Sequence, residues 1–303
     1  MTIYIPFIIL IAFAVYLGNA AISIFLGIIF LTILKPEDNF FSRRVGTTPL
    51  QIGIVLLGTT ISLSYAWNVS ANYLPWISLF VLGSFCIGLI LGKILGIHHR
   101  LAFLLSSGAA ICGGTAMAAM APIIKAKPQE LLIAMTIVFL LNAIAIILFP
   151  IIGHYLEMSN FQFGAWSALA IHDTSSVIGS AMIYSEESAQ VAATLKLGRT
   201  IWIIPLILFS NWIINRKAET TKFPIFILFF IFAILLNTFI GFSEIILEIL
   251  KISSQSFLML GLFCIGTQFN INDLKSISFK PLVLALILWL IVIPSSYWLV
   301  IYL

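Results

Sequence analysis

The chain has 303 residues, of which 61% are hydrophobic and only 9% are charged. A water-soluble domain carries about 25% charged residues, so this composition excludes a soluble enzyme or a soluble binding domain. The formal net charge of +4 does not indicate a nucleic-acid partner, because the basic residues fall mainly in short loops, where they set the orientation of a membrane protein. The composition therefore predicts an integral membrane protein embedded in the lipid bilayer.

Apolar runs close to the ~20 residues that a helix needs to cross a bilayer recur from one end of the chain to the other. The period-two alternation of a membrane β-barrel does not occur. The expected fold is therefore an all-α polytopic membrane protein, with one transmembrane domain over residues 1–303. The predicted transmembrane segments are 3–17, 20–34, 49–66, 73–96, 101–122, 130–152, 163–183, 192–215, 223–241, 253–269 and 281–302.

Lysine and arginine residues orient these segments. Basic residues accumulate in loops 35–48, 93–100, 216–222 and 270–280, and none occurs in loops 67–72, 153–162 and 184–191. Basic loops stay on the cytoplasmic side. The first group of loops is therefore predicted to be cytoplasmic, with the N-terminus inside and the C-terminus outside.

The loop "KAKPQE" (125–130) disagrees with this order. If segment 101–122 crosses the membrane, Lys125 and Lys127 lie outside, against the charge rule. If 101–122 dips in and returns, both lysines stay inside, and 163–183 must then re-enter from the outside. We prefer about eleven crossings, because both segments are long enough to cross. Nine crossings with two re-entrant segments is the alternative.

Two internal likenesses suggest repeats. "LQIGIVLLGTTISL" (50–63) is similar to "LMLGLFCIGTQFNI" (258–271), and "GAAICGGTAMAAM" (108–120) is similar to "LAIHDTSSVIGSAM" (169–182). Many transporters are built from inverted repeats. We therefore predict that the halves 1–157 and 158–303 are inverted repeats of one another.

The glycine-rich stretch 106–122 is the first candidate site. Together Gly113 and Gly114 cost a helix about 2 kcal/mol relative to alanine, and in lipid every freed backbone group needs a partner. Such a break is tolerated where it lines a cavity, and it presents N–H groups and a positive helix end to an anion. We predict that Cys112, Gly113, Gly114 and Thr115 contribute to substrate binding. The alternative is close helix packing by small residues.

The stretch "AIHDTSSV" (170–177) is the second candidate. A carboxylate inside the membrane costs on the order of 3 kcal/mol, which favours a functional role for Asp173. Asp173 can carry a proton or bind a cation, and His172 titrates near neutral pH. Both are predicted to bind substrate and to couple transport. The hydroxyls that can bind an oxyanion belong to Thr174, Ser175 and Ser176. The alternative is a hydrated cluster near the membrane interface.

The third candidate stretch, "ATLKLGRT" (193–200), carries positive charge, opposite to that of Asp173. Lys196 and Arg199 are three residues apart and share one face of a helix. We predict that both face the central cavity and complete the anion site, since arginine suits the two-point recognition of oxyanions. Snorkelling of both side chains to the lipid headgroups is the alternative.

Three stretches, "GAAICGGTAMAAMAPIIKA", "HDTSSV" and "ATLKLGR", resemble in order and separation the signatures of the sulfate exporter, or YeiH-type, family of bacterial membrane proteins. That family is placed with transporters of the bile-acid, arsenite and riboflavin type. The resemblance implies an inverted-repeat fold with crossing, broken helices, which here would be 101–122 and 253–269. It also implies the inner (cytoplasmic) membrane as the location.

The function expected from these features is secondary active transport, because no Walker loop, which would indicate direct use of ATP, occurs in the sequence.

 The expected substrate is a small anion such as sulfate, sulfite or a sulfonate, exported with a coupling proton or sodium ion. We expect no cofactor, no bound metal and no nucleic-acid partner, and a homodimer is compatible with the sequence. One alternative is an intramembrane enzyme that acts on a lipid-linked substrate with His172 as base, and another is an anion channel.

Overall fold

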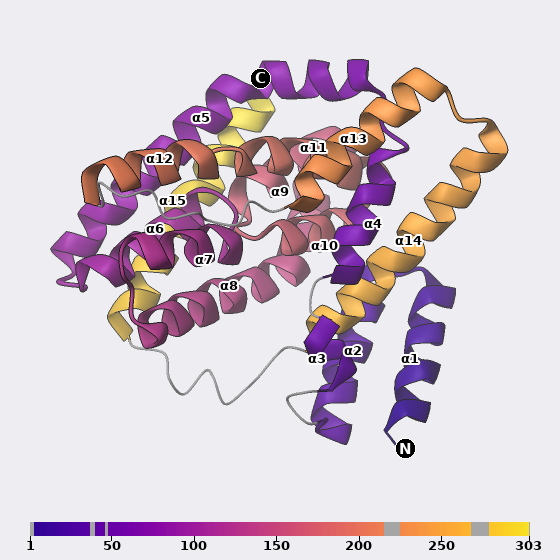
Figure 1. Cartoon of the computed structure of the whole chain (residues 1–303), viewed down its shortest axis with the longest axis horizontal. Helices are drawn as coiled ribbons and strands as arrows, with labels where there is room; N and C mark the ends of the chain where they lie inside the picture. The colour runs from indigo at the N-terminus through magenta and orange to yellow at the C-terminus, as the bar shows by residue number, and fades with distance from the viewer. Residues whose placement is uncertain (1–2, 37–39, 46–47, 215–224, 268–278, 303) are drawn as a thin grey trace. The chain divides into compact units, whose positions relative to one another are not determined.

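A computed structural model describes residues 3–36, 40–45, 48–214, 225–267 and 279–302 (Figure 1). In these ranges every regular element is a helix, which confirms the predicted all-α polytopic membrane fold. The helices long and apolar enough to cross a membrane are Tyr73–Ile94, Gln129–Tyr155, Glu186–Ser210, Glu244–Gly266 and Phe279–Tyr302. Of the predicted basic loops, 216–222 and nearly all of 270–280 lie outside the described residues.

The chain forms two compact units, and the first combines residues 1–67 with 225–270. Its helices are α1 (Tyr4–Leu17), α2 (Ala20–Leu34), α3 (Phe41–Val45), α4 (Thr48–Gly58), α13 (Ile225–Ile240) and α14 (Glu244–Gly266). Glycines bring α4 and α14 into backbone contact, because a Cβ atom on Gly261 would lie 2.5 Å from the backbone nitrogen of Leu50. The two similar stretches, 50–63 and 258–271, thus include parts of α4 and α14, which pack on each other.

The second unit combines residues 68–224 with 271–303. Its helices are α5 (Leu63–Ile94, which begins in the first unit), α6 (His99–Ala110), α7 (Gly114–Ile123), α8 (Pro128–Tyr155), α9 (Asn160–Ala170), α10 (Thr174–Tyr184), α11 (Glu186–Thr200), α12 (Ile203–Ile214) and α15 (Phe279–Tyr302). Each unit takes residues from both halves of the sequence. The inverted repeat of 1–157 and 158–303 stays a prediction.

Helices α6 and α7 form a hairpin, which we call hairpin 1 (residues 99–123). At its open end, Nη1 of Arg100 donates a 2.8 Å hydrogen bond to the carbonyl oxygen of Lys125. Near its tip, a Cβ atom on Gly108 would lie 2.9 Å from Cγ of Met117. The start of α6 and the end of α7 therefore lie together, and the chain turns back at residues 111–113 (Figure 1).

Helices α9 and α10 form a second hairpin, hairpin 2 (residues 160–184). The ring of Phe163, near the start of α9, stacks on the ring of Tyr184, the last residue of α10, with 4.0 Å between the centroids. The hydroxyl of Tyr184 also donates to the carbonyl oxygen of Met158, just before α9. The chain turns back at residues 171–173.

Both hairpins reach only part of the way through a bilayer. Their arms have 10 to 12 residues, or about 15–18 Å at 1.5 Å per residue, which is about half of a ~30 Å hydrocarbon core. Helix α8, with 28 residues, crosses fully between them, so the two hairpins open on opposite sides.

These hairpins correct the preferred count of eleven crossings. Segments 101–122 and 163–183 turn back, as the alternative of nine crossings with two re-entrant segments has it. Lys125 then lies beside Arg100, and the charge conflict at "KAKPQE" disappears. Segment length was misleading because two half-length arms contain as many apolar residues as one crossing.

The expected pair of broken helices was also wrong. Segment 101–122 is broken, but its partner is 163–183, because α14 runs without a break from Glu244 to Gly266. Residues 268 and 269 of the expected segment lie outside the described residues. The glycines of α14 serve packing: a Cβ atom on Gly266 would lie 2.3 Å from the carbonyl oxygen of Ile24 in α2.

The hairpins predict a labelling pattern. Single cysteines at His99 and Lys127, introduced after Cys86, Cys112 and Cys264 are replaced by alanine, should react with an impermeant maleimide from one side of the membrane. Cysteines at Asn160 and Glu187 should react from the other side. All four positions are exposed. Labelling of positions 99 and 127 from opposite sides would show that 101–122 crosses.

Candidate functional site

The tips of the two hairpins meet. Gly113 has φ +64° and ψ −123°, and a Cβ atom placed on it would lie 3.1 Å from Cβ and 3.2 Å from Cα of Asp173. Residues 111–113 of hairpin 1 thus touch residues 171–173 of hairpin 2. The two candidate stretches, 106–122 and 170–177, are thus brought together at one point in the second unit.

The end of α6 exposes carbonyl groups that the helix itself cannot satisfy. The carbonyl oxygen of Ser107 accepts from the N–H of Ile111 (3.1 Å), and that of Gly108 from the N–H of Gly113 (2.8 Å). The last two carbonyl oxygens, of Ala109 and Ala110, accept from Nη2 and Nε of Arg199, each at 2.7 Å. Arg199 on α11 therefore caps the first arm of hairpin 1.

The same guanidinium also caps the first arm of hairpin 2. Its Nη1 donates to the carbonyl oxygens of Ala168 (3.2 Å) and Leu169 (2.7 Å) in α9. Beside it, Nζ of Lys196 donates to the carbonyl oxygen of Ile171 at 2.7 Å. The negative ends of two helix dipoles thus face two cations, an arrangement that stabilises both partners.

Lys196 and Arg199 share one face of α11 and are buried, whereas their place at a central anion site stays a prediction. Their exposed fractions are 0% and 1%, which rules out snorkelling to the headgroups. Their described hydrogen bonds all go to backbone oxygens. Four of the five N–H groups of a guanidinium are used in this way, so Arg199 keeps little capacity to bind an anion directly.

Asp173 is the N-cap of α10. Its Oδ2 accepts hydrogen bonds from the N–H (3.1 Å) and the hydroxyl (3.2 Å) of Ser176. Asp173 and Ser175 are partly exposed within the unit, whereas Thr174 and Ser176 are buried. The carboxylate is therefore a structural cap, a stabilising role for aspartate, on a residue that is partly exposed.

His172 lies away from this carboxylate. The backbone is extended at Ile171 and Asp173, and side chains alternate along extended backbone. His172 is 1% exposed, and its ring lies 6.5 Å from the ring of Trp289 in α15. Among the described residues neither ring nitrogen has a hydrogen-bond partner. His172 and Asp173 are thus neighbours in sequence that face different surroundings.

The start of α7 completes the exposed part of the site. Cys112 and Gly113 are buried, Gly114 is partly exposed and Thr115 is exposed. The N-cap Gly113 has no side chain, and the Cys112 sulfur accepts from the N–H of Ala116 in the first turn, so this positive helix end is only partly satisfied. We call Gly114, Thr115, Asp173 and Ser175 the tip edge.

Sequence reasoning missed the backbone oxygens that hold the cations, and it missed Trp289. A signal for the oxygens does exist. "SGAAI" (107–111) and "SALAI" (167–171) precede the two breaks, and in each the isoleucine N–H bonds to the serine carbonyl oxygen, at 3.1 and 3.0 Å. This similarity marks two equivalent helix ends.

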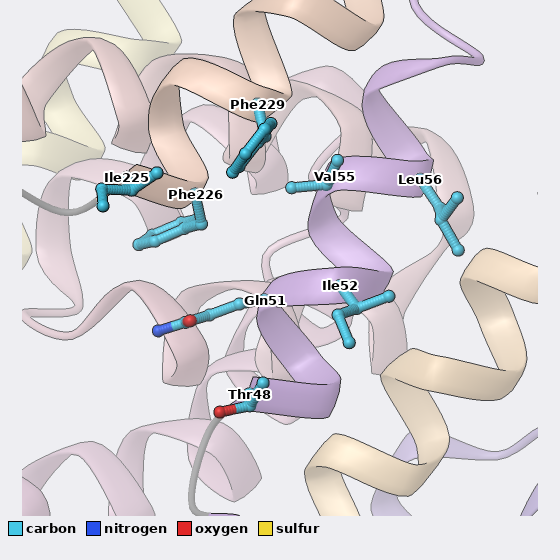
Figure 2. A pocket seen from close by; sticks show the side chains of 8 residues that line it. All are labelled: Thr48, Gln51, Ile52, Val55, Leu56, Ile225, Phe226 and Phe229. Carbon is cyan, nitrogen blue, oxygen red and sulfur yellow. The ribbon is translucent and has the colours of Figure 1, made fainter.

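A separate groove of about 360 Å³ lies between α4 and α13 in the first unit (Figure 2). Six of its lining residues are apolar, and Thr48 and Gln51 are the polar ones. The residues that line it are Thr48, Gln51, Ile52, Val55, Leu56, Ile225, Phe226 and Phe229. No charged side chain lines this groove, so it does not resemble a site for an anion.

Apolar helices around two hairpins that meet tip to tip define a polytopic membrane protein with interrupted helices inside the membrane. The family described as conserved hypothetical protein 698 matches residues 6–285, and the chain belongs to this family.

Relatives of similar length support this assignment. A UPF0324 membrane protein of Bacteroides thetaiotaomicron is 37% identical over 278 residues, which cover 91% of this chain and 84% of the relative. Those of Vibrio parahaemolyticus and Bdellovibrio bacteriovorus are 39% and 35% identical and cover 83% and 95% of this chain, and 83% and 90% of their own lengths. No solved structure matches the chain.

Proposed function

We propose that the protein is a secondary active transporter of a small anion. The observation that carries this proposal is the contact between two hairpin tips at Gly113 and Asp173. Interrupted backbone at this depth is tolerated only where it is buried in protein or lines a cavity. Transporters use such interruptions to bind substrates and coupling ions.

The charges near the tips favour an anion. Two buried cations, Lys196 and Arg199, hold the first arms, and Asp173 is the carboxylate at the tips. The positive end of α7 lies at the same tip. Sulfate, sulfite and sulfonates are the proposed substrates, and export is the proposed direction, in keeping with the resemblance to the sulfate exporter family.

Asp173 is the proposed coupling residue, through binding of a proton or a sodium ion, because it is the acidic residue at the hairpin tips and is partly exposed. His172 would act from the buried side of the tip, where it faces Trp289. This separation gives no support to an enzyme in which His172 and Asp173 form a relay. The alternative of a channel is distinguished from a transporter by flux that does not saturate.

The test is flux into proteoliposomes that contain the purified protein. We expect saturable uptake of labelled sulfate, sulfite or methanesulfonate that depends on an imposed proton or sodium gradient, and no uptake into protein-free liposomes. Chloride and phosphate serve as comparison anions. Flux that does not saturate would indicate a channel, and absence of flux for the whole panel would contradict anion transport.

A further inference from the structure

Arg199 donates hydrogen bonds to both hairpins. Nε and Nη2 bind α6 at Ala110 and Ala109, and Nη1 binds α9 at Ala168 and Leu169. The partners in α6 lie 89 and 90 residues from Arg199 in the sequence, and those in α9 lie 30 and 31 residues away. One planar group thus joins two segments that lie far apart in the sequence.

Only arginine can make this connection. Its guanidinium presents five N–H groups in a fixed plane, whereas the ammonium of lysine is a compact charge with three donors on a flexible stem. Lys196 illustrates the difference, because its described bonds reach only hairpin 2, at Ala168 and Ile171. The two cations on one helix face therefore contact different segments: Arg199 bonds to both hairpins, and the described bonds of Lys196 go to hairpin 2.

We infer that Arg199 is a positioning residue that couples the two hairpin tips, so that neither tip opens without the other, and that it acts on the tip edge through the backbone and not as a substrate ligand. Opening of either tip leaves buried carbonyl oxygens and a buried charge without partners, which is costly in a membrane interior. This inference concerns the tips themselves and does not depend on which solute is carried.

Two buried tip positions report on opening. Cys112 in hairpin 1 is 1% exposed, and Thr174 at the start of α10 is 8% exposed. One background keeps Cys112 as the single cysteine, with Cys86 and Cys264 replaced by alanine. The other background also carries Cys112→Ala and has Thr174→Cys as its single cysteine.

The measurement is the rate of maleimide labelling of each reporter in purified protein in detergent or liposomes. Arg199→Lys should raise the rate at both reporters, by about tenfold for each charge-assisted hydrogen bond lost. Lys196→Gln is the matched variant, because the described bonds of Lys196 reach only hairpin 2. Arg199 still joins the tips in this variant, so the rate should rise at both reporters, and a rise at residue 174 alone would also overturn the coupling. A rise at one reporter only in Arg199→Lys would overturn the coupling.

Wild-type protein provides a second test that needs no substitution at Arg199. Hydrogen exchange followed by mass spectrometry should give one common opening rate for peptides that contain residues 109–113 and 168–173. Different rates would contradict coupled opening. Failure of anion flux with intact coupling would refute the proposed function alone, so the two ideas are tested separately.

Discussion

Replacement of Asp173 by asparagine is expected to abolish gradient-driven anion transport while the protein still folds and inserts. Asparagine is as good an N-cap as aspartate, so its side-chain oxygen can still accept from the N–H of Ser176, as Asp173 does at 3.1 Å. The amide neither takes up a proton near neutral pH nor supplies a negative charge to a cation. Flux in proteoliposomes should fall to the level of protein-free liposomes.

Ser176→Ala is the control for this experiment. It removes the 3.2 Å hydroxyl bond to Asp173 but keeps the carboxylate, and we expect most of the transport to remain. Thermal unfolding should be similar in wild type and in both variants. If Asp173→Asn transports like wild type under a gradient, Asp173 has no coupling role.

Gly113→Ala is expected to reduce transport by more than about tenfold and to lower stability. At φ +64° and ψ −123°, any residue other than glycine is strained, at a cost of about 1–3 kcal/mol. The new methyl group would also lie 3.2 Å from Cα of Asp173, and backbone cannot move aside as a flexible side chain can. The tips should separate, which thermal unfolding and flux can both detect.

Gly114→Ala is the matched control. Residue 114 begins α7, where alanine is favourable, and its methyl group would meet the end of the Phe139 ring at 3.2 Å. We expect normal folding and at least about half of the wild-type flux, since a ring can shift by a few tenths of an ångström. Equal losses at 113 and 114 would favour a general packing role for this stretch.

Composition and local chemistry predicted a large part of this protein. The all-α membrane fold followed from its apolar content, and the break at Gly113 followed from the cost of paired glycines in a helix. The placement of Lys196 and Arg199 on one helix face followed from their spacing. Each of these inferences depends on residues close together in the sequence.

The features that could not be predicted depend on contacts between distant segments. A hairpin and a crossing of the same length have the same composition, and only contacts such as Arg100 to Lys125 distinguish them. The two lysines of "KAKPQE" gave the better signal, although segment length seemed stronger. The partners of Arg199 were missed, because the stretches "SGAAI" and "SALAI" mark two similar helix ends but do not say which side chain binds their backbone oxygens.

The distance in sequence between hairpin 1 and Arg199 has a consequence for biogenesis. Ala109 and Ala110 leave the ribosome 89 to 90 residues before the side chain that binds their carbonyl groups. At 5–20 residues per second this is a delay of about 5–20 seconds. During that time the carbonyl groups at the tip of hairpin 1 lack their final partners and cannot be exposed to lipid. The tip must therefore stay in contact with water or protein until α11 has been inserted.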